Sequence, residues 1–163
     1  MLGVLGYLIV SGFADIEHRY FLGGGMSHSS FRFEGLTLTV QDIERSLDFY
    51  GKKLGLTVWH NAAPDFAMLK IGDKIGGGTI GLLSIARAKS DGAEETTALQ
   101  KRSIHVEFST DDLDGLYKDL LSRSVIFHEP PHDEPWERSM TAFDPDGYAI
   151  EFAQGRRGHN ATG

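Results

Sequence analysis

The feature that most constrains this chain is an order of predicted elements that occurs twice. Residues 36–40 alternate apolar and polar side chains, which is the period of a strand with one buried face. A helix is predicted next, because Asp42 suits an N-cap, apolar residues then recur at helical spacing, and Gly55 is a favoured helix end. Three more strands are predicted at residues 56–59, 66–71 and 79–86.

The same order returns about 70 residues later. A strand at residues 104–108 precedes Asp111 and Asp112, which suit a helix start, and leucines at helical spacing follow. Further strands are predicted at residues 125–128, 139–143 and 148–153, with a proline-rich loop before the second and a type I turn, 144–147, before the third.

Together the two halves predict an α+β fold. It consists of paired βαβββ modules that form a curved, cleft-bearing, antiparallel-rich sheet. The predicted domain spans residues 33–154, with modules at 33–86 and 102–154 and the linker 87–102 between them. One helix cannot cover both faces of a four-stranded sheet, so each sheet is expected to keep one open face.

The composition excludes several functions. The chain has 163 residues, with 16 Lys and Arg against 23 Asp and Glu, so its formal charge is −7 and it lacks the basic surface of a nucleic-acid partner. It has no cysteine, which excludes disulfides, thiolate nucleophiles and cysteine-bound zinc. Any metal must be held by His, Asp or Glu.

The ends of the chain carry no recognisable chemistry. Residues 1–13 are apolar but shorter than the roughly 20 residues that span a membrane, and no Lys or Arg precedes them as in a signal peptide. Residues 1–32 are interpreted as an N-terminal extension: a pairing strand, a helix that covers the domain, or sequence upstream of a start at Met26. Residues 155–163 are expected to be a flexible tail. We expect a cytoplasmic protein with no membrane partner.

The strand periodicity places small and charged side chains on the open faces. In each predicted first strand, alternate apolar residues face the helix, so the residues between them share the opposite face. In the second half the last strand presents an acidic residue in the same way. The predicted open-face residues are Gly35, Thr37 and Thr39 in the first half, and His105, Glu107, Ser109 and Glu151 in the second.

Three segments resemble the vicinal oxygen chelate superfamily, which includes glyoxalase I, extradiol dioxygenases, fosfomycin-resistance enzymes and bleomycin-resistance proteins. They are VQDIERSLDFYGKKLGL, IHVEFSTDDLDGLY and PWERSMTAFDPDGYAIEF, and the last is the most specific. The resemblance runs from about residue 33 to 154. It implies paired βαβββ modules, in agreement with the repeat, and commonly a dimer.

The resemblance also implies a metal site that is only half present. Family members take one ligand from the first strand and one from the last strand of each module. Here the second module offers His105 and Glu151. The first module has Gly35 and Gly81 at the matching positions, or Leu83 in place of Gly81 if the gap between the aligned modules is placed differently. Two side chains generally hold a metal poorly. Replacement oxygens from Glu107, Glu34 or His28 are not placed by the family motif.

Each candidate residue has a structural alternative. His105 and Glu151 suit a general acid and base even without metal, or a salt-bridged pair without chemistry. Trp136 and Arg138 suit ligand stacking and anion pairing, or core packing and a surface salt bridge. His128 and His132 are interpreted as exposed histidines. The predicted ligand-binding residues are Thr37, Thr39, Glu107, Trp136 and Arg138.

The resulting function hypothesis is a homodimeric protein that binds a small, cationic or amphipathic molecule without requiring a metal, similar to the bleomycin-resistance branch. The alternative is a divalent-metal-dependent lyase, isomerase or extradiol-type dioxygenase, in which His105 and Glu151 hold Zn, Ni, Mn or Fe. Glyoxalase I activity is disfavoured because both first-module ligands are missing. A third hypothesis is a partner-binding subunit with a vestigial cleft.

Overall fold

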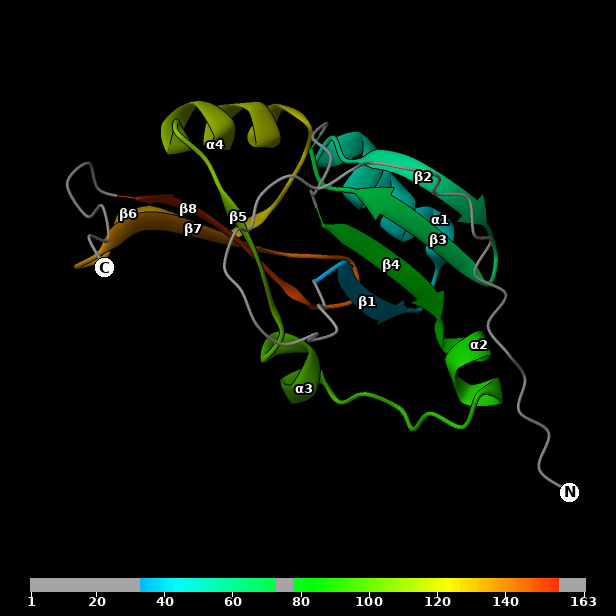
Figure 1. The fold of residues 1–163 in the computed structure, drawn as a ribbon. Coiled ribbons are helices and arrows are strands. Elements are labelled where there is room, and N and C mark those ends of the chain that lie inside the picture. The colour runs from blue at the N-terminus through cyan, green and yellow to red at the C-terminus, as the bar shows by residue number, and fades with distance from the viewer. Residues whose placement is uncertain (1–32, 73–77, 156–163) are drawn as a thin grey trace, which may run out of the picture. The chain divides into compact units, whose positions relative to one another are not determined.

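The computed structural model describes residues 33–72 and 78–155 of the chain (Figure 1). The predictions for residues 1–32, which include His28, lie outside the described residues. So does the prediction for the tail after Gly155. Among the described helices, none is both long and apolar enough to cross a membrane.

The first module forms a four-stranded mixed sheet in the order β1-β4-β3-β2, in which β1 pairs parallel with β4 and the other pairs are antiparallel. Its helix starts where the Asp42 side chain accepts the backbone N–H of Arg45 at 2.9 Å. The elements are β1 (Gly35–Val40), α1 (Ile43–Leu47), its π-helical continuation η1 (Asp48–Lys53), β2 (Thr57–Ala62), β3 (Phe66–Lys70) and β4 (Thr79–Ser84).

The second module repeats this topology in the order β5-β8-β7-β6. Its helix also starts at an aspartate, because the Asp112 side chain accepts the N–H of Gly115 at 2.9 Å. The elements are β5 (His105–Ser109), α4 (Leu113–Ser122), β6 (Phe127–Asp133), β7 (Glu137–Phe143) and β8 (Ala149–Gly155). The predicted α+β fold of paired βαβββ modules is confirmed, and the sheets are not closed.

Three local predictions were wrong. The fourth strand ends at Ser84 rather than at residue 86, because the Ser84 side chain caps a helix, α2 (Ile85–Ser90). The predicted linker contains α2 and a second short helix, α3 (Ala98–Arg102), which starts at a capping box on Thr97. The proline-rich segment is strand β6. Prolines are tolerated there because β6 is an edge strand, where a missing N–H costs little.

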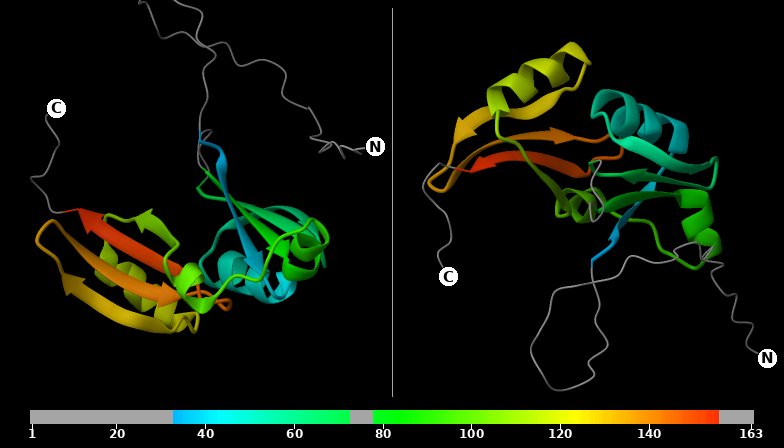
Figure 2. Two further views of the ribbon diagram at one scale, coloured as in Figure 1. Left: turned by 90° about the horizontal axis from the view of Figure 1, so that it is seen from below. Right: turned by 45° about the horizontal axis from the view of Figure 1, so that its top comes forward.

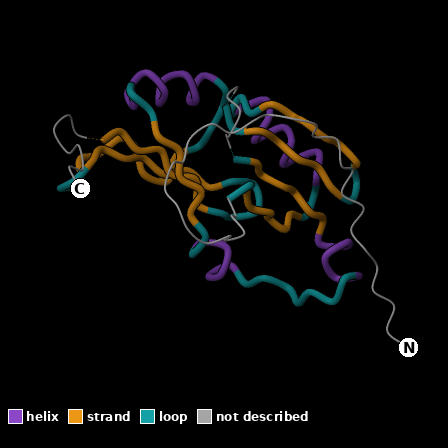
Figure 3. Tube along the Cα trace, viewed as in Figure 1, coloured by secondary structure: helices purple, strands orange, loops and turns teal. Residues whose placement is uncertain are grey.

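Each helix covers one face of its own sheet, as the ribbon and tube views show (Figures 2 and 3). Helix α1 contacts β3 and β4, and α4 contacts β6 and β8. The apolar side chains beneath them are almost fully buried, and in β1, β3 and β5 they alternate with more exposed ones, as the periodicity predicted. The core includes Leu38, Val40, Leu69, Ile80 and Leu82 in the first module, and Val106, Met140, Ala142, Ile150 and Phe152 in the second.

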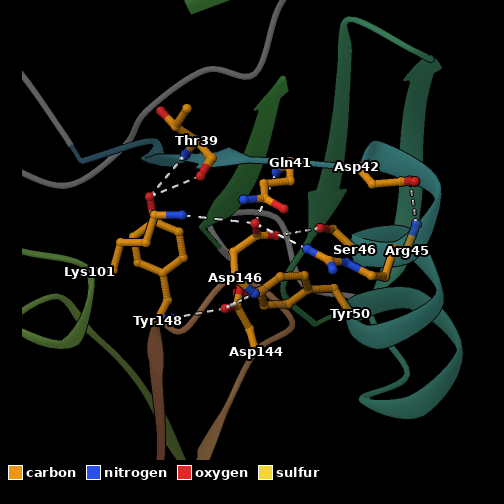
Figure 4. A network of polar contacts seen from close by, with 10 residues as sticks. All are labelled: Thr39, Gln41, Asp42, Arg45, Ser46, Tyr50, Lys101, Asp144, Asp146 and Tyr148. Atoms are coloured by element: carbon orange, nitrogen blue, oxygen red, sulfur yellow. Dashed lines mark hydrogen bonds and ion pairs between the residues drawn. The ribbon is translucent and has the colours of Figure 1, made fainter. Parts of the chain in front are cut away.

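The turn at residues 144–147 attaches the second module to the first (Figure 4). The Asp146 carboxylate is 1% exposed, and its Oδ1 accepts the backbone N–H of Gln41 at 2.9 Å. The same oxygen lies 3.2 Å from an Arg45 guanidinium nitrogen and 3.9 Å from Lys101 Nζ. A carboxylate of the second module thus lies at the start of the first module's helix, where two cations compensate its burial.

Asp144 and two tyrosines complete this attachment. The Tyr50 hydroxyl donates to Asp144 Oδ2 at 2.8 Å, and Asp144 Oδ1 accepts the N–H groups of Asp146 and Tyr148. Burial raises the pKa of Asp144 and of Tyr50. The Tyr148 hydroxyl donates to the carbonyl oxygen of Thr39 in β1 at 3.1 Å. The residues just before β8 are therefore fixed to the first module at three points.

Candidate functional site

His105 and Glu151 meet on the open face of the second sheet. Strands β5 and β8 pair in parallel, with His105 opposite Ala149 and Glu107 opposite Glu151. His105 Nδ1 lies 3.3 Å from Glu151 Oε2, although 46 positions separate the residues in the chain. The His105 side chain is 49% exposed and that of Glu151 is 22% exposed. The pair is therefore accessible to a ligand from solvent.

Glu107 extends this pair to a group of three. One donor atom from each of His105, Glu107 and Glu151 lies within 4.8 Å of the other two. We call these residues the His–Glu–Glu cluster. All three side chains point away from α4, because Val106, Ile150 and Phe152 occupy the helix-facing positions between them.

A third carboxylate lies on the same face. Glu129 in β6 is opposite Thr141 in β7, and Thr141 is opposite Glu151, so these side chains share one side of the sheet. No lysine or arginine among the described residues forms an ion pair with Glu107, Glu129 or Glu151. Within the described part of the chain, the charged neighbours of these carboxylates are therefore histidines, His105 beside Glu151 and His132 near Glu129.

An aromatic group lies beside this acidic surface. Phe143 is opposite Ala149, which is opposite His105, so the phenyl ring lies two strands away from the imidazole. The His128 ring centroid lies 5.0 Å from that of Phe143, and the Arg102 guanidinium carbon lies 5.3 Å from it. Sequence reasoning missed Phe143, although its place in the alternation of β7 puts it on the face of Thr141.

The first module has no room for side chains at the matching positions. Gly35 is opposite Thr79 and Thr37 is opposite Gly81, which is the register of β5 and β8 shifted by 70 residues. Gly81, rather than Leu83, therefore corresponds to Glu151. A Cβ atom on Gly35 would clash with the backbone oxygen of Thr79, and one on Gly81 would lie 2.7 Å from Thr37 Oγ1. A side chain at Gly35 would thus require the backbone at Thr79 to move, and one at Gly81 would require the Thr37 side chain to move.

The open face of the first sheet is aromatic and basic instead. Phe66, Met68 and Lys70 alternate with the buried residues Ala67 and Leu69 of β3, so they point away from α1. Lys70 Nζ lies 4.2 Å from the centre of the Trp59 ring, a cation–π contact, and the Trp59 side chain is half exposed. The predictions omitted these residues, although the alternation at 66–70 indicates their common face.

The remaining predicted ligand residues are dispersed. Thr37 and Thr39 lie on the open face of the first sheet, as expected from the alternation in β1. Trp136 lies in the β6–β7 hairpin loop and is 60% exposed, so the alternative of core packing was wrong. It lies five positions before Thr141, the partner of Glu151, which corresponds to roughly 17 Å along a strand.

Arg138 points away from the candidate site. It is opposite Gln154 and forms a two-bonded ion pair with Asp114 of α4, at 2.8 and 3.3 Å, on the helix side of the sheet. It also pairs with Asp133 at 3.1 Å. The guanidinium lowers the pKa of Asp114, and the carboxylate raises the pKa of Arg138. Of the two alternatives for Arg138, the structure therefore shows the surface salt bridge. It lies on the face of the sheet opposite to Glu151.

The structure also contains a groove that sequence reasoning did not anticipate. It has a volume of about 370 Å³ and lies between the first module's helix and β2. Its lining does not include His105 or Glu151. The His–Glu–Glu cluster lies on an accessible sheet face, and this groove is on the other module.

Fold and site together define a class of protein: two βαβββ modules with open sheet faces, one of which carries a histidine and carboxylates. The chain belongs to the glyoxalase/bleomycin resistance protein/dioxygenase superfamily, whose family model matches residues 32–152. A search of curated proteins gives no match.

Solved structures with this fold are similar to the chain. A glyoxalase/bleomycin resistance protein/dioxygenase from Nocardioides is 26% identical, with a TM-score of 0.66, and the match covers 81% of this chain and 88% of that one. A superfamily member from Sphaerobacter thermophilus is 25% identical, with a TM-score of 0.58 and coverage of 77% and 98%. TnmS3, an antibiotic-binding protein from Streptomyces, is 21% identical, with a TM-score of 0.60 and coverage of 79% and 99%.

Proposed function

We propose that the open face of the second sheet binds a small cationic or amphipathic molecule without requiring a metal, as the bleomycin-resistance branch of the family does. The observation that carries this proposal is a group of carboxylates that no lysine or arginine of residues 33–72 and 78–155 pairs with: Glu107, Glu129 and Glu151. A cation on this face gains charge-assisted hydrogen bonds to carboxylates that form no ion pair with a lysine or arginine of the described residues. The fold shared with an antibiotic-binding protein supports the same reading.

The neighbouring groups suit an amphipathic ligand. Phe143 offers an aromatic ring beside the carboxylates, and an apolar ring of the ligand can stack there by displacing Arg102 or His128 from it. His105 and Glu151 orient each other through their 3.3 Å contact. Thr37, Thr39 and Trp136 are proposed as further ligand contacts, whereas Arg138 is not, because it lies on the helix side.

We further propose that the protein acts as a cytoplasmic homodimer. The open faces of both sheets are exposed in the single chain, including the half-exposed Trp59 of the first sheet. Pairing of two copies would cover such faces and enclose a ligand between them. Sedimentation of the full chain tests this proposal: a dimer is expected, and a monomer at micromolar concentration contradicts it.

A metal-dependent enzyme of the lyase, isomerase or extradiol dioxygenase type is the second candidate. It is favoured by the convergence of His105 and Glu151, which are also the residues that the family resemblance assigns to a metal. A bound divalent ion would supply Lewis-acid polarisation of oxygen atoms on a substrate. The carboxylates of the cluster would then orient the substrate and accept a proton from it.

Thermal shift of the full chain against a panel of cationic aromatic compounds, in the presence of chelator, tests the leading proposal. A ligand at about 100 times its Kd stabilises a protein by about 2.7 kcal/mol, which raises the Tm of a domain this size by roughly 5 to 10 °C. Glu151→Gln is expected to remove most of the shift. Glu94→Gln, an equal charge change at an exposed position between α2 and α3, is the matched control. Equal responses of both variants, or no response to any compound, contradict the proposal.

A further inference from the structure

We infer that Glu107 completes a divalent-cation site with His105 and Glu151, so that the second module alone supplies all of the protein ligands. The inference concerns the sheet face of the proposed function, but it does not depend on the cationic ligand proposed there. It departs from the arrangement implied by the family resemblance, in which each module contributes ligands.

The geometry of the cluster fits one ion. Ligand atoms around a bound zinc lie about 2.0 to 2.2 Å from it, so two of them are roughly 3 to 4 Å apart. The donor atoms of His105, Glu107 and Glu151 lie within 4.8 Å of one another, and His105 Nδ1 and Glu151 Oε2 are 3.3 Å apart. The 3.3 Å separation already falls in this range, and the 4.8 Å limit exceeds it by less than about 1 Å.

The backbone supports this arrangement. Glu107 and Glu151 are directly opposite each other in the parallel β5–β8 pair, and His105 precedes Glu107 by two residues on the same face. Strand β8 is central in its sheet, and the residues before it are fixed to the first module through Asp144 and Tyr148. Two of the ligands are therefore adjacent on neighbouring strands before any ion binds, which reduces the entropy lost on binding.

The first module cannot contribute ligands from the corresponding strand positions. Gly35 and Gly81 have no donor side chain, and close contacts with Thr79 and Thr37 leave no space for one. Among the residues that the structure describes, those grouped closely enough to hold an ion on this face therefore all belong to the second module. Glu107, two residues after His105, is the carboxylate placed to replace the ligands that are missing at Gly35 and Gly81.

The charge and ligand types indicate the kind of ion. Two carboxylates compensate the charge of a divalent cation, and one imidazole with two oxygens suits Mn²⁺, Fe²⁺ or Zn²⁺ better than a soft ion. Three protein ligands leave at least one coordination position for water or a ligand oxygen. Since the three side chains lie on an open face, these free positions point toward solvent.

Titration of the metal-stripped full chain with Mn²⁺, followed by electron paramagnetic resonance of the free ion, tests the inference. We expect one Mn²⁺ per chain in the wild type and at least a tenfold weaker affinity for Glu107→Gln and for His105→Gln. Glu129→Gln is the matched control, because Glu129 lies on the same face two strands from Glu151, roughly 10 Å away. Its affinity is expected to stay within twofold of the wild type. Circular dichroism melting of each variant verifies that it is folded.

Three results would overturn the inference: no saturable Mn²⁺ binding, equal losses for Glu107→Gln and Glu129→Gln, or one ion per two chains. These outcomes are distinct from a failure of the proposed function. If cationic aromatic compounds still stabilise the protein while Mn²⁺ does not bind, only the cation site is wrong. If Mn²⁺ binds through Glu107 but no cationic compound stabilises the protein, the cation site stands and the leading function fails.

Discussion

The two modules have the same topology and nearly the same register, yet their open faces differ in chemistry. At positions separated by 70 residues the first module has Gly35 and Gly81, whereas the second has His105 and Glu151. Around the glycines the first sheet presents Trp59, Phe66, Met68 and Lys70. Around His105 the second sheet presents the carboxylates of Glu107, Glu129 and Glu151.

This difference shows which residues the fold requires. The helix-facing residues are apolar and buried in both modules, because each helix must cover one face of its sheet. The open faces take no part in that packing, so their chemistry can differ while the fold is the same. The carboxylates of the second sheet therefore need no counterparts at the matching glycine positions of the first, and four predictions probe the two modules and their attachment.

The largest expected effect concerns the attachment of the second module to the first. Asp144→Ala removes the acceptor of the Tyr50 hydroxyl and of two backbone N–H groups, in a site that is 5% exposed. Leaving such donors unpaired is expected to cost about 3 to 5 kcal/mol of unfolding free energy, measured by urea denaturation. Asp144→Asn keeps an acceptor and is the control. A loss below about 1 kcal/mol for the alanine variant would show that this turn does not hold the modules together.

The second prediction compares equivalent positions of the two modules. Gly35→Ala introduces a Cβ against the backbone of Thr79 and is expected to cost about 1 to 3 kcal/mol. His105→Ala, at the matching position of the second module, changes an exposed side chain and is expected to stay within about 0.5 kcal/mol of the wild type. Denaturation midpoints with unchanged m-values provide the measurement. Equal effects would mean that the two positions are not sterically different.

The third prediction uses the two tryptophans, one in each module. Trp136→Ala is expected to weaken stabilisation by a cationic aromatic compound by about 1 kcal/mol, the value of one aromatic contact. Trp59→Ala leaves the stabilisation by the compound unchanged if the second module binds the ligand alone. Thermal shifts at several ligand concentrations separate the two cases. A larger loss for Trp59→Ala would indicate that the first module's open face, from the same chain or a second copy, forms part of the site.

The smallest effect is the pH dependence that Asp144 contributes. Burial raises its pKa in the folded protein, so the folded state binds the proton more tightly than the unfolded state does. Its stabilising contribution is therefore fully present below the unfolded-state pKa and is lost as pH rises through the folded-state value. The stability of Asp144→Asn relative to wild type is expected to increase with pH across that window. A relative stability that is independent of pH contradicts the assigned cause.

Much of this architecture could be predicted from local signals. Asp42 and Asp112 cap the helices as expected, and the alternation in residues 36–40 and at Val106 gave the correct buried faces, whereas Ile104 lies before β5 and is 41% exposed. The sequence-based predictions were wrong where a residue type occurs in a structure that it usually disfavours or is not expected to start. Prolines in an edge strand were interpreted as a loop, and Ser84 was not recognised as a helix cap.

The site was only partly predictable. The alternation placed Glu107 on the face of His105, but only the pairing of β5 with β8 places it opposite Glu151. Arg138 was a ligand candidate because its segment resembles a family motif. Its alternation with the buried Met140 and Ala142 places it on the helix side of β7, whereas its salt bridge to Asp114, 24 positions away, appears only in the tertiary structure.

By itself the sequence determined the repeated order of elements, the buried face of each strand and the presence of donors at only two of the four expected positions, since these depend on periodicity and residue type. The tertiary structure decided which donors converge, why the glycine positions cannot accept side chains, and which residues connect the modules. Those properties depend on pairing between strands and on contacts between modules. Such contacts join residues far apart in the chain, and local sequence does not encode their geometry.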